Sequence, residues 1–209
     1  MSTKSAKQKI LDAASILFYN DGITNTGINT ITDKAKVAKM SLYNNFPTKS
    51  DLITCYIEAR HQEWLDLYEK RKVQIKTPMD GILAIFDAYQ DHAEFAYEKG
   101  FRGCGLLNAA AEFPAHSPER LAVKNHKDEI ENIVAGHLSQ LFKEPQKVQR
   151  LALLISFILE GSIARAGLES SSEKVFAAKQ MVQNLLEHEI SNLVVHFLIS
   201  VLILALSPF

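Results

Sequence analysis

A short polar run between residues 39 and 49 carries the side chains with the most specific chemistry in this chain. It holds two ammonium groups, Lys39 and Lys49, and two neighbouring amides, Asn44 and Asn45. An ammonium can bind a phosphate or the O6 and N7 atoms of guanine, whereas an amide can pair with the N6 and N7 atoms of adenine. Lys49 also stands where a helix would begin, and the N–H groups of a helix N-terminus favour an anion. These residue types suit contact with a nucleic acid, and which of them meets a base or a phosphate stays open.

The positive charge of the chain is also concentrated in its first fifty residues. Residues 1–49 contain seven lysines and three aspartates, a net charge of +4, whereas the other 160 residues carry −5 and the whole chain −1. A basic segment on an acidic remainder favours a polyanion that meets only the first fifty residues. Chance clustering of solvated lysines is the alternative, and the charge alone does not decide between the two.

These side chains need helices to position them, and the apolar spacing is helical along almost the whole chain. The spacing predicts about nine helices and no convincing strand, and therefore an all-α fold. Between residues 24 and 52 it predicts two short helices separated by a few residues, a helix-turn-helix. The inward side chains would be Ile28, Ile31, Ala35, Val37, Leu42, Tyr43 and Phe46. The outward side chains of the second helix, which enters the major groove in this motif, would be Lys39, Met40, Ser41, Asn44 and Asn45.

Turn and cap residues predict where several helices begin and end. Gly22 is expected to end the first helix as a left-handed cap. Thr48 and Asp51 form a weaker relative of a capping box, and Thr77 before Pro78 has N-cap and first-turn chemistry.

The run from Val37 to Leu52 resembles the signature of the tetracycline-repressor (TetR/AcrR) family of transcriptional regulators. The usual form of that signature has valine, a small-polar pair, Leu-Tyr, two polar residues, phenylalanine, a turn, lysine and leucine. The resemblance covers roughly residues 8–55 and includes Phe18 and Gly22 of the first helix. One departure is Lys36, where the family usually has glycine in the turn. A left-handed backbone there would cost a residue other than glycine about 1 kcal/mol.

The resemblance implies a cytoplasmic, homodimeric repressor that binds a palindromic operator in double-stranded DNA and is released by a small molecule. It implies a DNA-binding domain over residues 1–53 and an effector-binding and dimerisation domain over residues 54–209, with Tyr43 and Lys49 on phosphates. The alternative is a helical small-molecule carrier or membrane-tethered sensor. Such a carrier has no need of exposed basic and amide side chains between Lys39 and Lys49.

The middle of the chain has a mixture of aromatic, apolar and polar residues that suits either a small-molecule pocket or a plain core. The candidate pocket residues are Phe86, Tyr89, His92, Phe101, Cys104, Leu107, Asn108, Glu112, Ile133 and Phe157. We expect no cofactor, no metal site and no enzyme chemistry, because the histidines form no His-Glu-x-x-His pair. Two cysteines without a Cys-x-x-Cys spacing, and no secretory pattern at the start, favour a reducing, cytoplasmic setting.

The last twenty residues, 190–209, contain no formally charged side chain. An apolar stripe at helical spacing runs into this segment, and a stripe of that length on a monomer would leave a large exposed patch. We therefore expect a twofold interface, which the family resemblance also implies for the last two helices. Its residues would be Leu185, Leu186, Ile190, Leu193, Val194 and Phe197. A membrane tail anchor is the alternative, but the uninterrupted apolar stretch is shorter than the ~20 residues of a spanning helix, so no stable membrane association is expected.

Overall fold

The computed structural model describes residues 4–95 and 97–206, with side chains as far as Val195. This part of the chain contains nine helices and no strand, which confirms the all-α prediction. The helices are α1 (Ala6–Asp21), α2 (Ile28–Ala35), α3 (Lys39–Asn45), α4 (Lys49–Lys72), α5 (Pro78–Ala93), α6 (Gly105–Ala111), α7 (Pro118–Leu141), α8 (Pro145–Glu169) and α9 (Glu173–Leu206).

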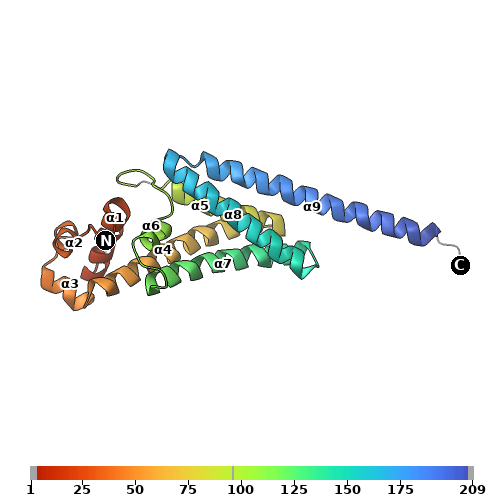
Figure 1. Ribbon diagram of the computed structural model, residues 1–209. Coiled ribbons are helices and arrows are strands. Elements are labelled where there is room, and N and C mark those ends of the chain that lie inside the picture. The colour runs from red at the N-terminus through yellow and green to blue at the C-terminus, as the bar shows by residue number, and fades with distance from the viewer. Residues whose placement is uncertain (1–3, 96, 207–209) are drawn as a thin grey trace.

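The long helix α4 connects two groups of helices (Figure 1). Helices α1, α2 and α3 form a small cluster at one end, which we call the head. Helices α5 to α9 form the body, in which α7 packs on α8, α8 on α9, and α5 on α4, α7 and α9. The short α6 contacts α1 as well as α4 and α7, so it joins the body to the head.

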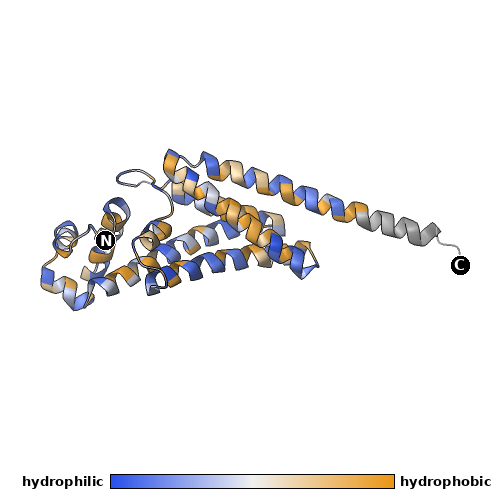
Figure 2. Cartoon of the chain, viewed as in Figure 1, coloured by the Kyte–Doolittle hydropathy of each residue, from blue (hydrophilic) through white to orange (hydrophobic). Residues whose placement is uncertain are grey.

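The core is built from apolar stripes on these helices. Figure 2 shows hydrophobic and hydrophilic residues alternating along most helices, as expected where one side is buried, whereas hydrophobic residues dominate the middle of α8. The largest fully buried side chains include Tyr56, Tyr89, Phe46 and Phe86, so aromatic rings fill much of the interior.

The predicted caps on α4 and α5 are present. The Thr48 hydroxyl accepts the N–H of Asp51 at 3.1 Å, and the Asp51 carboxylate accepts the N–H of Thr48 at 2.9 Å, which completes a capping box. Thr77 and Asp80 make the same pair of bonds at the start of α5.

Lys36 and Gly22 both have a positive φ, but their backbone conformations differ. Lys36 takes the left-handed conformation, with φ 54° and ψ 50°, at the turn where the resemblance predicts it. Gly22 caps the end of α1 as predicted, with its N–H on the Phe18 carbonyl, but its φ of 90° and ψ of 157° are extended, so the left-handed conformation predicted there was wrong. This extended conformation is essentially restricted to glycine, and it sends the chain away from α1 instead of curling it back.

Candidate nucleic-acid interface

Helices α2 and α3 are held together by apolar side chains that face α1. Ile31 of α2 and Leu42 of α3 are fully buried, and α1 contacts both helices. In the turn, the left-handed Lys36 directs the N–H of Val37 to the carbonyl oxygen of Thr32 at 3.1 Å. The head therefore has the predicted helix-turn-helix geometry.

The outer face of α3 presents most of the predicted contact residues to solvent. Met40 is 70% exposed and Tyr43 is 40% exposed, and Lys39 and Asn44 are exposed as well. Tyr43 was also placed in the inward set, and that assignment was wrong. It follows Leu42 directly in the helix, so when Leu42 points into the core Tyr43 is turned about 100° away.

Ser41 and Asn45 are less available than their neighbours. Both are half-buried, and the Asn45 Nδ2 donates to the backbone carbonyl of Ser41 at 2.8 Å. Of the two adjacent amides, Asn44 is therefore the one that is free to meet a base edge.

Lys49 begins α4, where a phosphate contact is predicted. Its Nζ donates to the carbonyl oxygen of Ile23 at 2.6 Å and lies 6.0 Å from the centre of the Phe18 ring. Burial lowers the pKa of Lys49, and the nearby Glu112 carboxylate opposes that shift. The ammonium thus binds the loop between α1 and α2 in this conformation.

Glu112 lies at the junction between head and body, not in a ligand pocket. Its two carboxylate oxygens accept the backbone N–H groups of Ile23 at 2.8 Å and Thr24 at 2.7 Å. Burial raises the pKa of Glu112, but the N–H donors and Lys49 outweigh burial, so the pKa lies below its usual value. The extended Gly22 exposes these N–H groups, and a Cβ there would approach the carboxylate to 3.1 Å. The sequence held no signal for this contact, because its partners are 89 residues apart.

Further ion pairs and hydrogen bonds join the same two parts. Lys34 of α2 pairs with Glu98 at 2.9 Å, and the Tyr19 hydroxyl donates to the carbonyl of Gly103 at 3.1 Å. The Arg102 guanidinium donates to the carbonyl of Tyr19 at 2.9 Å. The segment between α5 and α6 therefore binds the end of α1 and fixes the head against the body.

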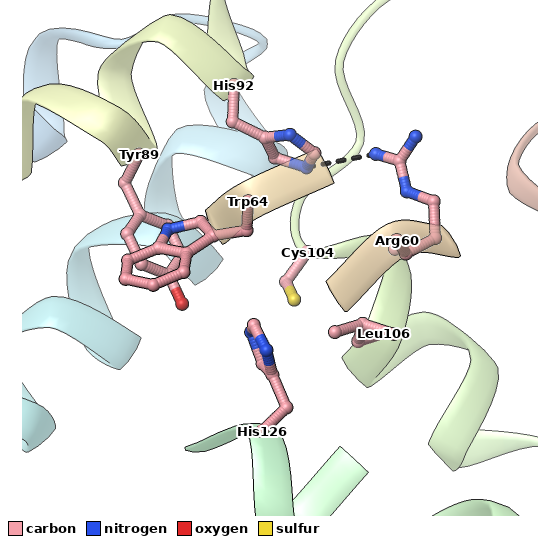
Figure 3. A pocket seen from close by; sticks show the side chains of 8 residues that line it. Arg60, Trp64, Tyr89, His92, Cys104, Leu106 and His126 are labelled. Carbon is pink, nitrogen blue, oxygen red and sulfur yellow. Dashed lines mark hydrogen bonds between the residues drawn. The ribbon is translucent and has the colours of Figure 1, made fainter. Parts of the chain in front are cut away.

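The body contains a small cavity between α4, α5, α6 and α7 (Figure 3). It is lined by Arg60, Trp64, Tyr89, His92, Cys104, Gly105, Leu106 and His126, and its volume is about 10 Å³. That volume holds about one water molecule. Of the ten predicted pocket residues, Tyr89, His92 and Cys104 lie at this cavity, and they are packed too closely to admit an effector in this conformation.

Two cations that were not predicted from the sequence stand beside the cavity, the buried Arg60 and the half-buried Lys127. Arg60 pairs with Glu63 at 2.7 Å and contacts the His92 Nε2 at 3.1 Å. Lys127 pairs with Glu160 at 2.8 Å and lies 3.2 Å from the Tyr89 hydroxyl. A single charged residue on an amphipathic helix resembles a solvated one in the sequence, so only the packing shows that Arg60 is buried and Lys127 half-buried.

The histidines at the cavity are neutral. Burial lowers the pKa of His92 to about 3, and the Arg60 and Lys127 cations add to this effect. Burial likewise lowers the pKa of His126 to about 3, with Lys127 and His61 adding to it. Neither imidazole carries a charge at neutral pH, so neither supplies a cation to the cavity.

Comparison with known proteins places the head in a family. Residues 10–54 match the family described as bacterial regulatory proteins, tetR family. The regulator QacR from Staphylococcus aureus is 24% identical over 138 residues, 66% of this chain and 69% of QacR. The regulator LmrA from Bacillus subtilis is 24% identical over 193 residues, 90% of this chain and 100% of LmrA. The structure of a TetR-family regulator from Streptomyces coelicolor superposes with a TM-score of 0.76 at 26% identity, covering 87% of this chain and 90% of that one.

Residues 10–54 of the chain belong to the tetR family. The chain is a DNA-binding transcriptional regulator, and the matched segment spans α1 to the beginning of α4, which includes the helix-turn-helix. Its relatives in these comparisons are transcriptional regulators and not enzymes.

The other predicted pocket residues of the regulator do not converge on the cavity. Phe86 is fully buried and Phe101 packs edge-on against His92, so both belong to the surrounding core. Leu107 is 39% exposed on α6 and Phe157 is 64% exposed on α8. Their helices turn these positions outward, which apolar composition alone does not reveal.

Asn108 and Ile133 also lie outside the cavity. The Asn108 amide donates to the carbonyl of Arg102 at 3.3 Å, so it ties down the start of α6. Ile133 lines a surface groove between α4 and α7 together with Leu65 and Tyr68. Both residues were assigned to the pocket by their position in the sequence, and the phase of their helices places them elsewhere.

The predicted interface residues fall into three groups. Leu186 is fully buried in the regulator's own core and is unavailable to a partner. Leu185 and Ile190 are half-buried, whereas Leu193 is 37% and Val194 is 54% exposed. The side chain of Phe197 lies outside the described residues.

One helix in the described part of the chain, α8, is long and apolar enough to span a membrane by length and composition. Core helices of soluble proteins meet the same criterion, and α8 packs on α5, α7 and α9 of the regulator.

Proposed function

We propose that this regulator is a homodimeric repressor that binds a palindromic operator and is released by a small molecule. The head, residues 1–53, would bind DNA, and residues 54–209 would bind the effector and form the dimer. The observation that carries the proposal is the outer face of α3, where Lys39, Tyr43 and Asn44 are exposed above a buried Leu42. A polar, basic face on a rigidly supported short helix suits entry into a major groove.

An exposed apolar face on α8 and α9 supports the dimer. In α8 most of the outward positions between Leu153 and Leu168 are uncharged: Leu153, Leu154, Phe157, Gly161, Ala164 and Leu168, with Arg165 as the charged exception. Phe157 is 64% exposed and Leu168 is 83% exposed. Leu193 and Val194 are exposed apolar side chains on α9. A second copy related by a twofold axis would cover this face with the same residues, and contiguous apolar patches of this kind normally mark an interface.

The dimer would set the spacing of the two α3 helices. Half-sites read by twofold-related helices lie about 34 to 36 Å apart, one turn of DNA. An effector would favour an arrangement in which the two α3 helices are not about 34 to 36 Å apart. To do so, it must bind that arrangement more tightly than the DNA-binding arrangement. The contacts of Glu112 and Lys34 between body and head supply a mechanical link for such coupling.

A gel-shift selection from random duplexes, with and without a panel of small metabolites, tests this proposal. We expect enrichment of one inverted-repeat sequence and its release by at least one uncharged, largely apolar compound, which should also raise the melting temperature. Stabilisation follows mass action and amounts to ~2.7 kcal/mol at a hundredfold excess over the dissociation constant. A pool without any common sequence would contradict operator binding, and a sequence that no compound releases would contradict effector control.

A further inference from the structure

A hollow of about 360 Å³ lies where the head meets the body, and we call it the junction hollow. This volume falls within the ~300 to 1,000 Å³ of typical small-molecule sites, whereas the body cavity holds one water. The hollow is lined by Ile16, Tyr19 and Asn20 from α1, by Arg60 from α4, and by Phe95 and Tyr97 after α5. Both the head and the body therefore contribute walls.

The walls of the junction hollow are mainly apolar and aromatic. Phe95 is 60% exposed and Ile16 is 38% exposed, although both line the same recess. The Tyr19 and Tyr97 rings stack with centroids 4.4 Å apart, and Phe95 meets the edge of Tyr97 at 5.6 Å. Covering exposed apolar side chains is favourable, and aromatic rings prefer to stack on or abut other flat rings. The shape and lining thus suit a flat aromatic molecule.

The charged groups at the junction hollow are already neutralised by partners within the chain. The Arg60 guanidinium pairs with Glu63 at 2.7 Å and donates to the Tyr97 hydroxyl at 3.1 Å. The Glu98 carboxylate accepts from Lys34 at 2.9 Å and from the Asn20 amide at 3.1 Å. A charged ligand would lose its hydration without gaining an unpaired counter-ion, and burying an unpaired charge is costly. The electrostatics therefore select an uncharged ligand.

We propose that the junction hollow is a binding site for a small, uncharged aromatic molecule and is the effector site of this regulator, so that α1 of the head takes part in effector binding together with residues 54–209. Binding in the hollow itself is independent of the proposed function, whereas the effector role rests on it. The site touches α1 on one side and the body on the other, so its shape exists only at one placement of the head. A ligand bound there changes the balance between head placements and hence DNA affinity.

Titration of the full chain with N-phenyl-1-naphthylamine, an uncharged aromatic fluorophore that brightens in apolar surroundings, tests the site. The parent should show saturable fluorescence. Ile16→Trp should plug the hollow and Phe95→Ala should remove an aromatic wall, and each should weaken binding by about tenfold or more. Leu121→Ala, which shortens another exposed apolar side chain on α7, is the matched control and should bind like the parent.

Circular dichroism and thermal melting of each variant show whether it is folded. If Ile16→Trp does not fold, Phe95→Ala still tests the site, because Phe95 lies at the surface. Equal weakening in the Leu121→Ala control, unchanged affinity in the folded hollow variants, or no saturable binding to the parent would each overturn the site.

The effector role is tested by repeating the titration with saturating operator duplex. Coupling is reciprocal, so DNA should change the affinity for the fluorophore by about fivefold or more, and the fluorophore should change the affinity for DNA by the same factor. An unchanged affinity would overturn the effector role but leave the site. A chain that binds the fluorophore yet no DNA would overturn the proposed function instead.

Discussion

At the scale of single residues, Glu112 makes the contacts that join the head to the body. One carboxylate accepts two consecutive backbone N–H groups, those of Ile23 and Thr24, and lies near Lys49, which binds the carbonyl of Ile23. The α1–α2 loop is therefore held by the body and by α4 at the same time. Lys49 would have to share or release this carbonyl if its ammonium meets a phosphate.

Glu112→Ala should lower the free energy of unfolding by about 1 kcal/mol at neutral pH, because it removes two hydrogen bonds to a charged but surface-exposed acceptor. The folded pKa is lowered, so this contribution is present above the unfolded pKa and is lost as the pH falls through the folded value. Urea denaturation of parent and variant should therefore converge at acidic pH. Glu58→Ala, an exposed glutamate on α4, should have little effect. A difference that grows on acidification would contradict the assignment.

Tyr43 and Asn44 are adjacent and both exposed, but we expect their substitutions to differ in effect. Tyr43→Phe should weaken DNA binding equally for all sequences and flatten its salt dependence, because a phosphate contact carries no sequence information. Asn44→Ala should relax the preference at one base pair by ~1 to 3 kcal/mol. Competition gel shifts with singly mutated duplexes separate the two effects, and full site preference in Asn44→Ala would rule out a base contact.

At the scale of elements, the sequence predicted what is decided locally. Helix periodicity and the Thr48 and Thr77 caps depend on residues within a few positions of each other, and all are present. At Gly22 the end of α1 was predicted correctly, but the left-handed conformation was wrong. Tertiary contact between the loop and Glu112 is part of the extended arrangement there.

The candidate sites also divide into features that are decided locally and features that depend on tertiary packing. The outward face of α3 followed from helical phase within a short motif, whereas the pocket required knowing which side of each body helix faces which neighbour. Composition could not distinguish the exposed Phe157 from the buried Phe86, or the core Leu186 from the exposed Val194. The buried Arg60 and the half-buried Lys127 were not predicted, because His92 and Glu160, which they contact, come from other helices.

Lys36 offers a test of the helix-turn-helix turn. Lys36→Gly should raise the free energy of unfolding by up to about 1 kcal/mol, because glycine adopts the left-handed backbone without steric cost. Lys36→Val should lower it by more, since a β-branched residue is a true outlier at positive φ. Thermal melts of the two variants measure both effects. A stabilising valine or a strongly destabilising glycine would show that the turn is not left-handed.

At the scale of the whole molecule, the apolar face of α8 is the feature that a single chain leaves uncovered. Phe157→Glu should place a charge in the middle of the proposed interface and yield monomers in light scattering, with loss of operator affinity. Leu121→Glu, at a similarly exposed site on α7, should remain dimeric. If Phe157→Glu remains dimeric, the dimer interface does not include this face of α8.

The central claim is that two α3 helices of one dimer read two half-sites on the same side of the DNA. The most direct measurement is the equilibrium affinity for a selected palindrome against the same palindrome with about five base pairs, half a helical turn, inserted at its centre. The insertion should turn one half-site to the opposite side of the DNA and reduce the affinity to that for non-specific DNA. Equal affinity for the two duplexes would contradict the central claim.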